Sequence, residues 1–391
     1  MQIPIFRGGG CMKKVKLGEI CEIVTGSTPK SSNPNYWNGE YKWITPAEIS
    51  DDDFIVFDTQ RKITKLGIEE TGLKSFPTGT VLLSSRAPIG KVAISGCEMY
   101  CNQGFKNFIC SNKINNEYLY YFFKSRKNYL NILGRGATFK EISKSIVSDI
   151  EIFLPTYGIQ RKQVKVLKKI DKLIYTRKEQ LIEFEYLVKS RFNEMFILSD
   201  FSLKRLGELV DEVRYGTSLP ATINGKYGYL RMNNITENGK LNIQNLKHID
   251  IPEKDLEKYV VRKGDVLFNR TNSIELVGKT CIYELDFDMV IAGYIIRIRT
   301  NNNILNPRYL SEFLNFPSTK KFLRNIAKGA VNQANINAKE LQDISIPLAP
   351  LSLQNEFADF VAQVDKSQLA IQKSLDELET LKKSLMQEYF G

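Results

Sequence analysis

Two long stretches of the chain place their apolar side chains on one helical face. In residues 354–391 the apolar positions are separated mostly by three or four residues, and Gln368 and Lys382 interrupt the series. That spacing is typical of the seam of a coiled coil. The apolar positions of this stretch are Phe357, Val361, Val364, Ile371, Leu375, Leu378 and Leu385.

A broader apolar stripe runs through residues 160–197. Its main positions are Val164, Leu167, Ile174, Leu181, Val188, Phe192 and Met195. Five further residues widen it, namely Val166, Ile170, Leu173, Phe184 and Leu187. A broad stripe is typical of a helix that is covered on more than one side. Because Gly and Pro are absent from the interior of both stretches, we expect two long helices, over residues 156–198 and 350–391.

The rest of the chain is divided into short apolar runs by Gly, Pro and Asn. The runs at 80–83, 92–95, 260–261, 266–268 and 295–298 are typical of strands. Helices are expected at 117–133 and 307–327. The residues that precede them, Asn115-Asn116 and Asn306-Pro307, have the composition of N-caps. The pattern therefore predicts a mixed α/β fold.

The chain contains an internal repeat. Seven landmarks occur twice in the same order, at offsets between 185 and 194 residues. They are LGE at 17–19 and 206–208, GSTP at 26–29 and GTSLP at 216–220, PTGTVLL at 77–83 and RKGDVLF at 262–268, GKVAI at 90–94 and GKTCI at 278–282, YL at 118–119 and 309–310, GA at 136–137 and 329–330, and IEIFL at 150–154 and ISIPL at 344–348. The repeat predicts two copies of one module of about 190 residues.

The repeat and the helices together predict the domain organisation. We expect a disordered leader at 1–11, with Met12 as the natural start, then a first domain at 12–155 and a central helix at 156–198. A second domain at 199–349 and a C-terminal helix at 350–391 complete the chain.

Charge indicates how the two helices pair. Residues 160–197 carry ten basic and five acidic side chains, whereas residues 354–391 carry four basic and seven acidic ones. Opposite charge beside two apolar seams favours mutual packing as an antiparallel coiled coil. The alternative is that each helix folds onto its own domain. The residues expected to form the helix pair and to support partner docking are Leu167, Ile174, Leu181, Val188, Val361, Val364, Ile371, Leu375, Leu378 and Leu385.

Composition narrows the function. The net charge of +11 favours a polyanionic partner such as nucleic acid. No stretch approaches about 18 consecutive apolar residues, and the start lacks a secretory pattern, so a cytoplasmic protein is expected. The six cysteines form no C-x-x-C pair, and His248 is the single histidine, which we interpret as an ordinary loop or strand residue. Neither a metal site nor His-based catalysis is expected.

Several stretches resemble the specificity subunit of type I restriction-modification enzymes, and the resemblance extends from Lys13 to the C-terminus. They are GSTP at 26–29, YKWITP at 41–46, LLSSRAPIG at 82–90, NQGF at 102–105, GATFKEI at 136–142 and IPLAPLSLQ at 346–354. The first copy departs from the proline-rich junction of the second, because Phe153 stands in the place of Pro347 and Thr156 in that of Pro350.

The resemblance implies a non-catalytic DNA-recognition subunit with two target-recognition domains. Each domain would read one half of a split, asymmetric sequence in double-stranded DNA. The helices would act as a spacer and as the docking surface for two adenine-N6 methyltransferase subunits, which restriction/translocase subunits can join. No cofactor or metal is expected on this chain, since S-adenosylmethionine, ATP and Mg²⁺ would bind the partner subunits.

The residues are consistent with such a reader on independent grounds. Two copies related by a pseudo-two-fold axis fit two half-sites, and copies of different sequence fit unrelated halves. Base edges are matched by Arg or Lys for guanine and by Asn or Gln for adenine. The loop residues with these chemistries are Lys30, Arg86, Lys91, Gln103, Arg135 and Lys140 in the first domain, and Arg231, Asn233, Asn234, Arg270, Asn272, Lys279 and Gln333 in the second. Each would contact either a base or a phosphate.

Two aromatic residues follow similar glycines, Phe105 after Gly104 and Tyr294 after Gly293. We expect both to belong to the core rather than to stack on bases.

The two alternatives to a DNA reader are an enzyme and a structural scaffold. Residues 273–280 end like a phosphate-binding loop but lack its leading Gly, so we interpret them as a turn between strands. Asn33-Pro34-Asn35-Tyr36 lacks the second Pro of an adenine-methyltransferase motif. The remaining alternative is a coiled-coil scaffold without sequence-specific DNA binding.

Overall fold

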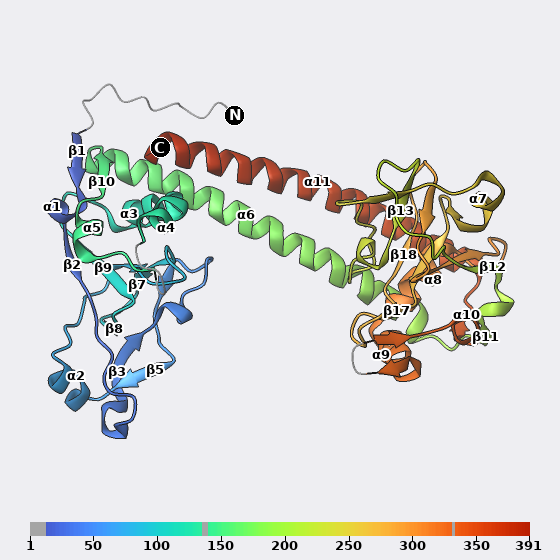
Figure 1. Cartoon of the computed structure of the whole chain (residues 1–391), viewed down its shortest axis with the longest axis horizontal. Coiled ribbons are helices and arrows are strands. Elements are labelled where there is room, and N and C mark those ends of the chain that lie inside the picture. The colour runs from blue at the N-terminus through green and yellow to red at the C-terminus, as the bar shows by residue number, and fades with distance from the viewer. Residues whose placement is uncertain (1–12, 135–139, 331–332) are drawn as a thin grey trace. The chain divides into compact units, whose positions relative to one another are not determined.

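The structure, a computed structural model, describes residues 13–134, 140–330 and 333–391 (Figure 1). The expected leader at 1–11 lies outside the described residues. Contacts divide the chain into two compact units. Unit 1 comprises Met1–Lys178 and Lys373–Gly391, and unit 2 comprises Glu179–Gln372. Each unit thus combines a globular head with parts of both long helices, α6 (Tyr157–Phe192) and α11 (Leu351–Phe390).

Unit 1 is built around a five-stranded sheet of order β2-β9-β6-β7-β4. A three-stranded sheet of order β5-β3-β8 and the pair β1-β10 complete it. Its strands are β1 (Lys13–Lys16), β2 (Cys21–Val24), β3 (Trp37–Ile44), β4 (Ile55–Val56), β5 (Arg61–Ile63), β6 (Val81–Ser84), β7 (Val92–Ser95), β8 (Tyr100–Cys101), β9 (Phe105–Cys110) and β10 (Glu151–Leu154). Its other helical elements are α1 (Leu17–Ile20), η1 (Pro34–Tyr36), η2 (Pro46–Glu48), α2 (Lys65–Thr71), α3 (Asn116–Ser125), α4 (Lys127–Leu133) and α5 (Lys144–Ser148).

Both faces of the central strands of unit 1 are covered. Helix α3 lies against β6 and β7, and Val81 and Leu83 share a core with its residue Phe123. Leu82 and Phe105 belong to a second core on the opposite face. All four residues of β6 are therefore buried, which is why this strand appears in the sequence as a continuous apolar run.

Unit 2 repeats this plan. Its four-stranded sheet has the order β12-β20-β16-β18, which corresponds to β2-β9-β6-β7, and the pair β11-β23 corresponds to β1-β10. Its strands are β11 (Leu203–Arg205), β12 (Val210–Tyr215), β13 (Tyr227–Leu230), β14 (Lys247–Ile249), β15 (Val260–Val261), β16 (Val266–Asn269), β17 (Thr271–Asn272), β18 (Thr280–Ile282), β19 (Met289–Ile291), β20 (Ile295–Thr300), β21 (Lys328–Ala330), β22 (Gln333–Asn335) and β23 (Ser345–Pro347). Its other helical elements are η3 (Asn193–Ile197), η4 (Leu206–Glu208), η5 (Met232–Asn234), α7 (Glu253–Tyr259), α8 (Pro307–Asn315), α9 (Pro317–Ile326) and α10 (Ala338–Gln342). The predicted repeat and mixed α/β fold are confirmed.

The helices predicted at 117–133 and 307–327 begin as expected but are each broken in two. Asn115 accepts a hydrogen bond from the backbone of Tyr118, and Asn306 accepts one from that of Arg308, so both N-caps are confirmed. The single uninterrupted helix was wrong. Phe316 is extended, with φ −63° and ψ 142°, because it precedes Pro317, and a residue before proline disfavours the helical conformation.

The two long helices pack against each other within each unit. In unit 1, Leu167 of α6 and Leu385 of α11 share one core, and the Lys382 amine lies 2.6 Å from the Asp171 carboxylate. In unit 2, the rings of Phe192 and Phe357 lie 5.2 Å apart. Residue numbers rise along α6 as they fall along α11, so the pair is antiparallel, as predicted.

The seam residues predicted from the sequence are removed from solvent to different degrees. Those that are buried are Leu167, Val361, Val364, Leu375 and Leu385, and those that are partly buried are Ile174, Leu181, Val188, Ile371 and Leu378. Helix α6 also packs on the head of unit 1 through Val164 and Ile170. Mutual packing and packing onto a head therefore occur together, which explains the broad stripe of α6.

Candidate nucleic-acid interface

The same glycine turn leads into β7 in unit 1 and into β18 in unit 2. Gly90 has φ 89° and Gly278 has φ 80°, a conformation that Gly adopts without strain. Each glycine is followed by a lysine, so the turn fixes the direction in which Lys91 and Lys279 leave the backbone. The stretch at 273–280 thus forms a turn between strands, as predicted.

Both lysines reach across to a short helical turn. The amine of Lys91 donates a hydrogen bond to the carbonyl of Pro46 at 3.0 Å, and that of Lys279 donates one to the carbonyl of Met232 at 3.1 Å. These carbonyls begin η2 and η5, respectively. Burial lowers the pKa of Lys279 below its usual value. Each lysine therefore anchors a turn of its own unit.

The turn η5 presents one amide and buries the next. The Asn234 side chain is buried; it accepts a hydrogen bond from the backbone of Arg231 at 2.8 Å and donates one to the carbonyl of Asn242 at 2.8 Å. The preceding residue, Asn233, is exposed, and Arg231 is partly buried. Asn234 closes the turn and Asn233 is directed to solvent, so the two adjacent candidates have different roles in the fold.

In unit 1 a charged cluster lies beside the end of β6. The Arg86 guanidinium contacts the Glu141 carboxylate at 2.8 Å, and the Lys106 amine contacts the same carboxylate at 3.1 Å. Lys106 also donates to Ser85 at 3.3 Å. Burial pushes the pKa of Glu141 upward, but the hydrogen bonds from Arg86 and Lys106 outweigh it and hold this pKa below its usual value.

In unit 2 the corresponding place is occupied by Arg270. Its guanidinium donates to the carbonyl of Gly293 at 3.2 Å and to the side-chain oxygen of Asn335 at 3.1 Å. It also lies over the ring of Tyr215, 4.8 Å from the ring centre. The backbones correspond as well, because Ile142 donates to the carbonyl of Ser85 and Ile336 donates to that of Arg270.

A loop of unit 1 carries the candidate Lys30 and contacts a second candidate, Gln103. The Trp43 indole donates to the carbonyl of Ser27 at 3.2 Å, and that of Trp37 donates to the carbonyl of Lys30 at 3.3 Å. The hydroxyl of Thr28 lies 2.5 Å from the side-chain oxygen of Gln103. The loop backbone is held by strand β3, while the side chains of Lys30 and Gln103 are exposed.

Backbone contacts bring the candidates of unit 1 together. Ser85 donates its backbone N–H to the carbonyl of Gly104 at 2.7 Å, and a side chain at Gly104 would touch Pro46. Arg86, Lys91 and Gln103 therefore belong to one region of the head. In unit 2 the Ala292 backbone donates to the carbonyl of Leu230, which brings the end of β13 beside the Gly293 carbonyl that holds Arg270.

The other described candidates differ in exposure. Lys140 and Gln333 are exposed, and Asn272, in β17, is partly buried. Arg135 lies outside the described residues. That these side chains contact DNA stays a prediction.

The two aromatic residues expected in the core have different fates. Phe105 is fully buried, as predicted, whereas Tyr294 is 49% exposed, so its assignment to the core was wrong. The reason is register. Phe105 pairs with Ser84 and Ile295 pairs with Asn269 in the equivalent ladders, so Ile295 is the counterpart of Phe105. Tyr294 precedes this counterpart by one residue, so its side chain points to solvent.

The sequence analysis did not single out four residues that contact the candidate arginines or share a partner with them. They are Lys106, Glu141, Tyr215 and Asn335. One signal was available, because Lys106 is a charged residue inside the apolar run 105–109, and a buried charge requires a partner. Asn335 and Tyr215 gave no such signal.

Among residues 13–134, 140–330 and 333–391, no three His, Cys, Asp or Glu side chains gather as metal ligands would. The described cysteines, Cys21, Cys97, Cys101, Cys110 and Cys281, are free thiols. His248 is exposed on β14, an ordinary strand residue as predicted. No helix within the described ranges combines the length and apolar composition needed to cross a membrane.

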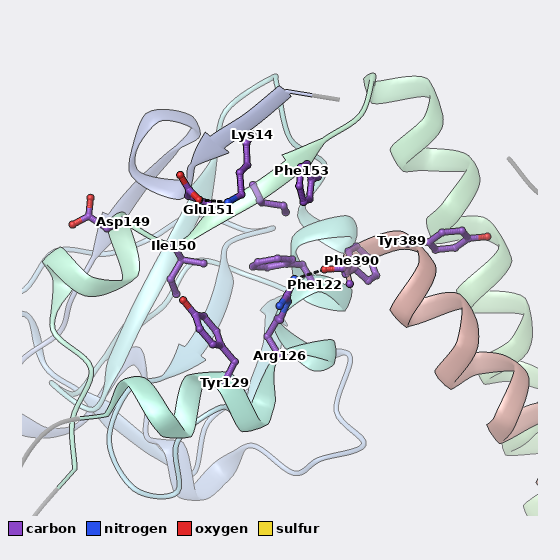
Figure 2. Close-up of a pocket in the computed structure, with 12 residues that line it drawn as sticks. Lys14, Phe122, Arg126, Tyr129, Asp149, Ile150, Glu151, Phe153, Tyr389 and Phe390 are labelled. Carbon is purple, nitrogen blue, oxygen red and sulfur yellow. Dashed lines mark hydrogen bonds and ion pairs between the residues drawn. The ribbon is translucent and has the colours of Figure 1, made fainter. Parts of the chain in front are cut away.

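A pocket of about 380 Å³ in unit 1 lies between β10, the α3–α4 pair and the end of α11 (Figure 2). Arg126 donates to the backbone carbonyl of Phe390, and Lys14 lies 2.5 Å from the Glu151 carboxylate. Its principal charged groups thus already have partners within the chain. We assign the pocket to the docking of α11 onto the head rather than to a ligand.

Comparisons with known proteins agree with the repeat. The sequence matches the family described as the type I restriction modification DNA specificity domain, over residues 11–185 and again over residues 199–381. The MjaIX type I restriction enzyme specificity subunit of Methanocaldococcus jannaschii is 35% identical, over 54% of this chain and 53% of its own length. The StySPI specificity subunit of Salmonella potsdam is 23% identical, over 78% of this chain and 72% of its own length. The chain spans about half the length of the MjaIX relative.

Solved structures show the same fold. The S subunit of a type I restriction-modification system from M. genitalium has a TM-score of 0.59 at 16% identity, and the match covers 97% of this chain and 96% of that chain. A chain from a study of complex assembly and conformational transition in the type I system has a TM-score of 0.63 at 20% identity, covering 96% of this chain and 97% of that chain. The likeness extends over both copies of the repeat.

Proposed function

Because the chain belongs to the type I restriction-modification DNA specificity family, we propose that it is the DNA-recognition subunit of a type I complex that reads a bipartite, asymmetric sequence. One observation carries the proposal. Each unit presents a polar region at the same place in the same fold, anchored by the equivalent lysines Lys91 and Lys279. A repeated surface of this kind suits two half-sites in one duplex.

The two regions differ in chemistry, which argues for two unrelated half-sites. Unit 1 places Arg86 and Lys106 around the carboxylate of Glu141, whereas unit 2 places Arg270 between a carbonyl and the amide of Asn335. The turn η2 presents Ala47 where η5 presents Asn233. Base edges are distinguished by such donor and acceptor patterns, so different side chains select different bases.

The net charge of +11 supports binding to the phosphate backbone. Lys30, Lys140 and Gln103 are exposed in unit 1, and we propose that they contact phosphates and so hold the register of the duplex. The affinity of the complex for DNA should fall steeply with salt, since each neutralised phosphate releases counterions.

We further propose that each unit docks one adenine-N6 methyltransferase subunit through apolar side chains that the helix pair leaves exposed. In unit 1 these include Tyr175, which is 65% exposed, and in unit 2 Tyr186, which is 67% exposed. The seam residues such as Leu375 face the other helix, so they support docking by keeping the pair together. The methyltransferases would carry S-adenosylmethionine and the chemistry, and restriction/translocase subunits would join through them with ATP and Mg²⁺.

The decisive experiment maps methylated adenines across a genome with and without this gene, with the methyltransferase subunit supplied. We expect methylation at one bipartite sequence whose halves are unrelated, and its loss when the gene is deleted. In competition with random duplexes the complex should prefer that sequence by several kcal/mol. Methylation that ignores sequence, or a flat competition result, would instead support a scaffold.

A further inference from the structure

The fold of unit 2 holds the Arg270 guanidinium in a defined orientation. Two of its N–H donors engage the Gly293 carbonyl and the Asn335 side chain, and Tyr215 supports one face of the guanidinium. Its Nε is buried and has no hydrogen-bond partner among the described residues. A planar guanidinium fixed by two acceptors and a ring has lost most of its rotational freedom before any ligand binds.

The contacts hold Arg270 without neutralising its charge. A carbonyl and an amide oxygen accept its hydrogen bonds, and within the described part of the chain no carboxylate forms an ion pair with it. Arg86 of unit 1 differs, because its Nε lies 2.8 Å from Glu141. The charge of Arg270 and the second N–H of each of its two terminal nitrogens therefore remain for a ligand.

The surroundings of Arg270 suit a nucleic-acid base. Tyr215 is 40% exposed and Tyr294 is 49% exposed, and the Tyr294 carbonyl accepts the backbone N–H of Arg270. The hydroxyl of Tyr215 accepts the backbone N–H of Ala338 at 2.7 Å, so this ring is fixed as well. Arg270 thus combines a rigid guanidinium, supported by the ring of Tyr215, with a second partly exposed aromatic residue, Tyr294, that it contacts through the backbone.

We propose that Arg270 is a specificity-determining residue that reads a guanine in the half-site bound by unit 2, which rests on the proposed function. Guanine presents two acceptors, O6 and N7, on its major-groove edge, and the guanidinium offers two parallel donors. Adenine presents a donor, N6, beside the acceptor N7, so one N–H of the guanidinium would face another donor. Asn335 and Tyr215 act as positioning residues, because they orient the fork.

The test uses the whole complex of this chain with its methyltransferase subunits and a duplex library randomised over both half-sites. Arg270→Lys keeps the charge and removes the planar fork. We expect one G·C position in one half-site to lose discrimination by about tenfold to a hundredfold, while the other half-site keeps its preference. Asn335→Ala keeps Arg270 but removes one of the two acceptors that orient its guanidinium. We expect discrimination at the same position to fall by a smaller factor. Arg86→Lys is the matched control and should leave that position unchanged.

Three results would overturn the inference. One is a wild-type half-site for unit 2 that contains no G·C pair. Another is a loss in Arg270→Lys that is uniform over all sequences, which would identify a phosphate contact. The third is an unchanged preference in both Arg270→Lys and Asn335→Ala. Each of them leaves the proposed function standing, whereas a wild-type complex without any bipartite preference would overturn that function.

Discussion

The side-chain amine of Lys279 donates a hydrogen bond to the backbone carbonyl of Met232, 47 residues earlier in the chain. Lys91 makes the equivalent bond to Pro46 in the other unit. Both bonds connect a glycine turn to a short helical turn, so they fix the relative position of two loops in each head.

We predict that Lys279→Met frees the turn η5 while preserving most of the apolar volume. The lost hydrogen bond should cost about 1 to 2 kcal/mol of the free energy of unfolding. Because Asn233 lies on η5, discrimination in the half-site of unit 2 should weaken, while that of unit 1 stays intact. Selection from a randomised duplex library measures this, and Lys91→Met should give the converse pattern. Equal loss in both halves for either variant would contradict the idea that each lysine acts on its own unit.

Phe390 fixes the end of α11 to the head of unit 1. Its ring lies 5.0 Å from that of Tyr118 and 6.2 Å from that of Phe122, and it is 3% exposed. We predict that Phe390→Ala lowers the free energy of unfolding by about 3 to 5 kcal/mol, through lost burial and the cavity left behind. Calorimetry should detect this as a lower unfolding temperature.

The control for Phe390 lines the same pocket (Figure 2). Phe153 is 41% exposed, so Phe153→Ala should change stability far less. Phe196, whose ring lies 4.7 Å from that of Tyr309, holds the equivalent place in unit 2, and Phe196→Ala should resemble Phe390→Ala. Comparable small effects in all three variants would show that these rings do not secure the helix ends.

The repeat in the sequence was sufficient to predict that Lys91 and Lys279 are equivalent. The pairs Gly90-Lys91 and Gly278-Lys279 were aligned from the sequence, and both occupy the same turn. The seam was also predictable, because apolar residues spaced by three and four along such a long stretch indicate an amphipathic helix. Gln368, which interrupts that period, accepts a hydrogen bond from Lys240 of the same unit.

Features that depend on distant partners could not be predicted. Tyr294 was assigned to the core because it follows a glycine as Phe105 does. In the structure Ile295 takes the place of Phe105, one residue later. A shift of one residue moves a side chain to the other face of a strand, and sequence spacing does not show that shift. The partners of Lys106 and Arg270, Glu141 and Asn335, lie 35 and 65 residues away. Which candidate cations are neutralised and which keep their charge is decided by those partners.

Breaking the helix pair should abolish docking of the methyltransferase subunit. Leu375 is buried in the seam with 6% exposure, and Leu375→Pro both removes a helical hydrogen bond and clashes with the preceding turn, at a cost of about 3 kcal/mol or more. We predict that this variant no longer co-purifies with the methyltransferase subunit. Leu375→Met preserves the apolar side chain and should co-purify normally. Undiminished co-purification of Leu375→Pro would mean that docking lies elsewhere.

Glu312 of α8 should make the stability of unit 2 depend on pH. Burial raises the pKa of its carboxyl to about 6, the charge of Asp365 acts in the same direction, and Arg308, Lys189 and Lys240 oppose both. Because the folded protein holds this proton more tightly than the unfolded chain, stability is greatest below the unfolded pKa and falls as pH rises through about 6. The loss corresponds to roughly 2 kcal/mol, at 1.36 kcal/mol per pKa unit.

Glu312→Gln should therefore raise the unfolding temperature relative to wild type at pH 8 and leave it nearly unchanged at pH 4, where the wild-type carboxyl is mostly protonated in both states. Calorimetric scans across this pH range measure the difference between the two curves. Glu377→Gln, at an exposed position on α11, is the control and should follow the wild-type curve throughout. A Glu312→Gln curve parallel to that of wild type would show that this carboxyl titrates alike in the folded and unfolded chain, and burial would then have no effect on its proton.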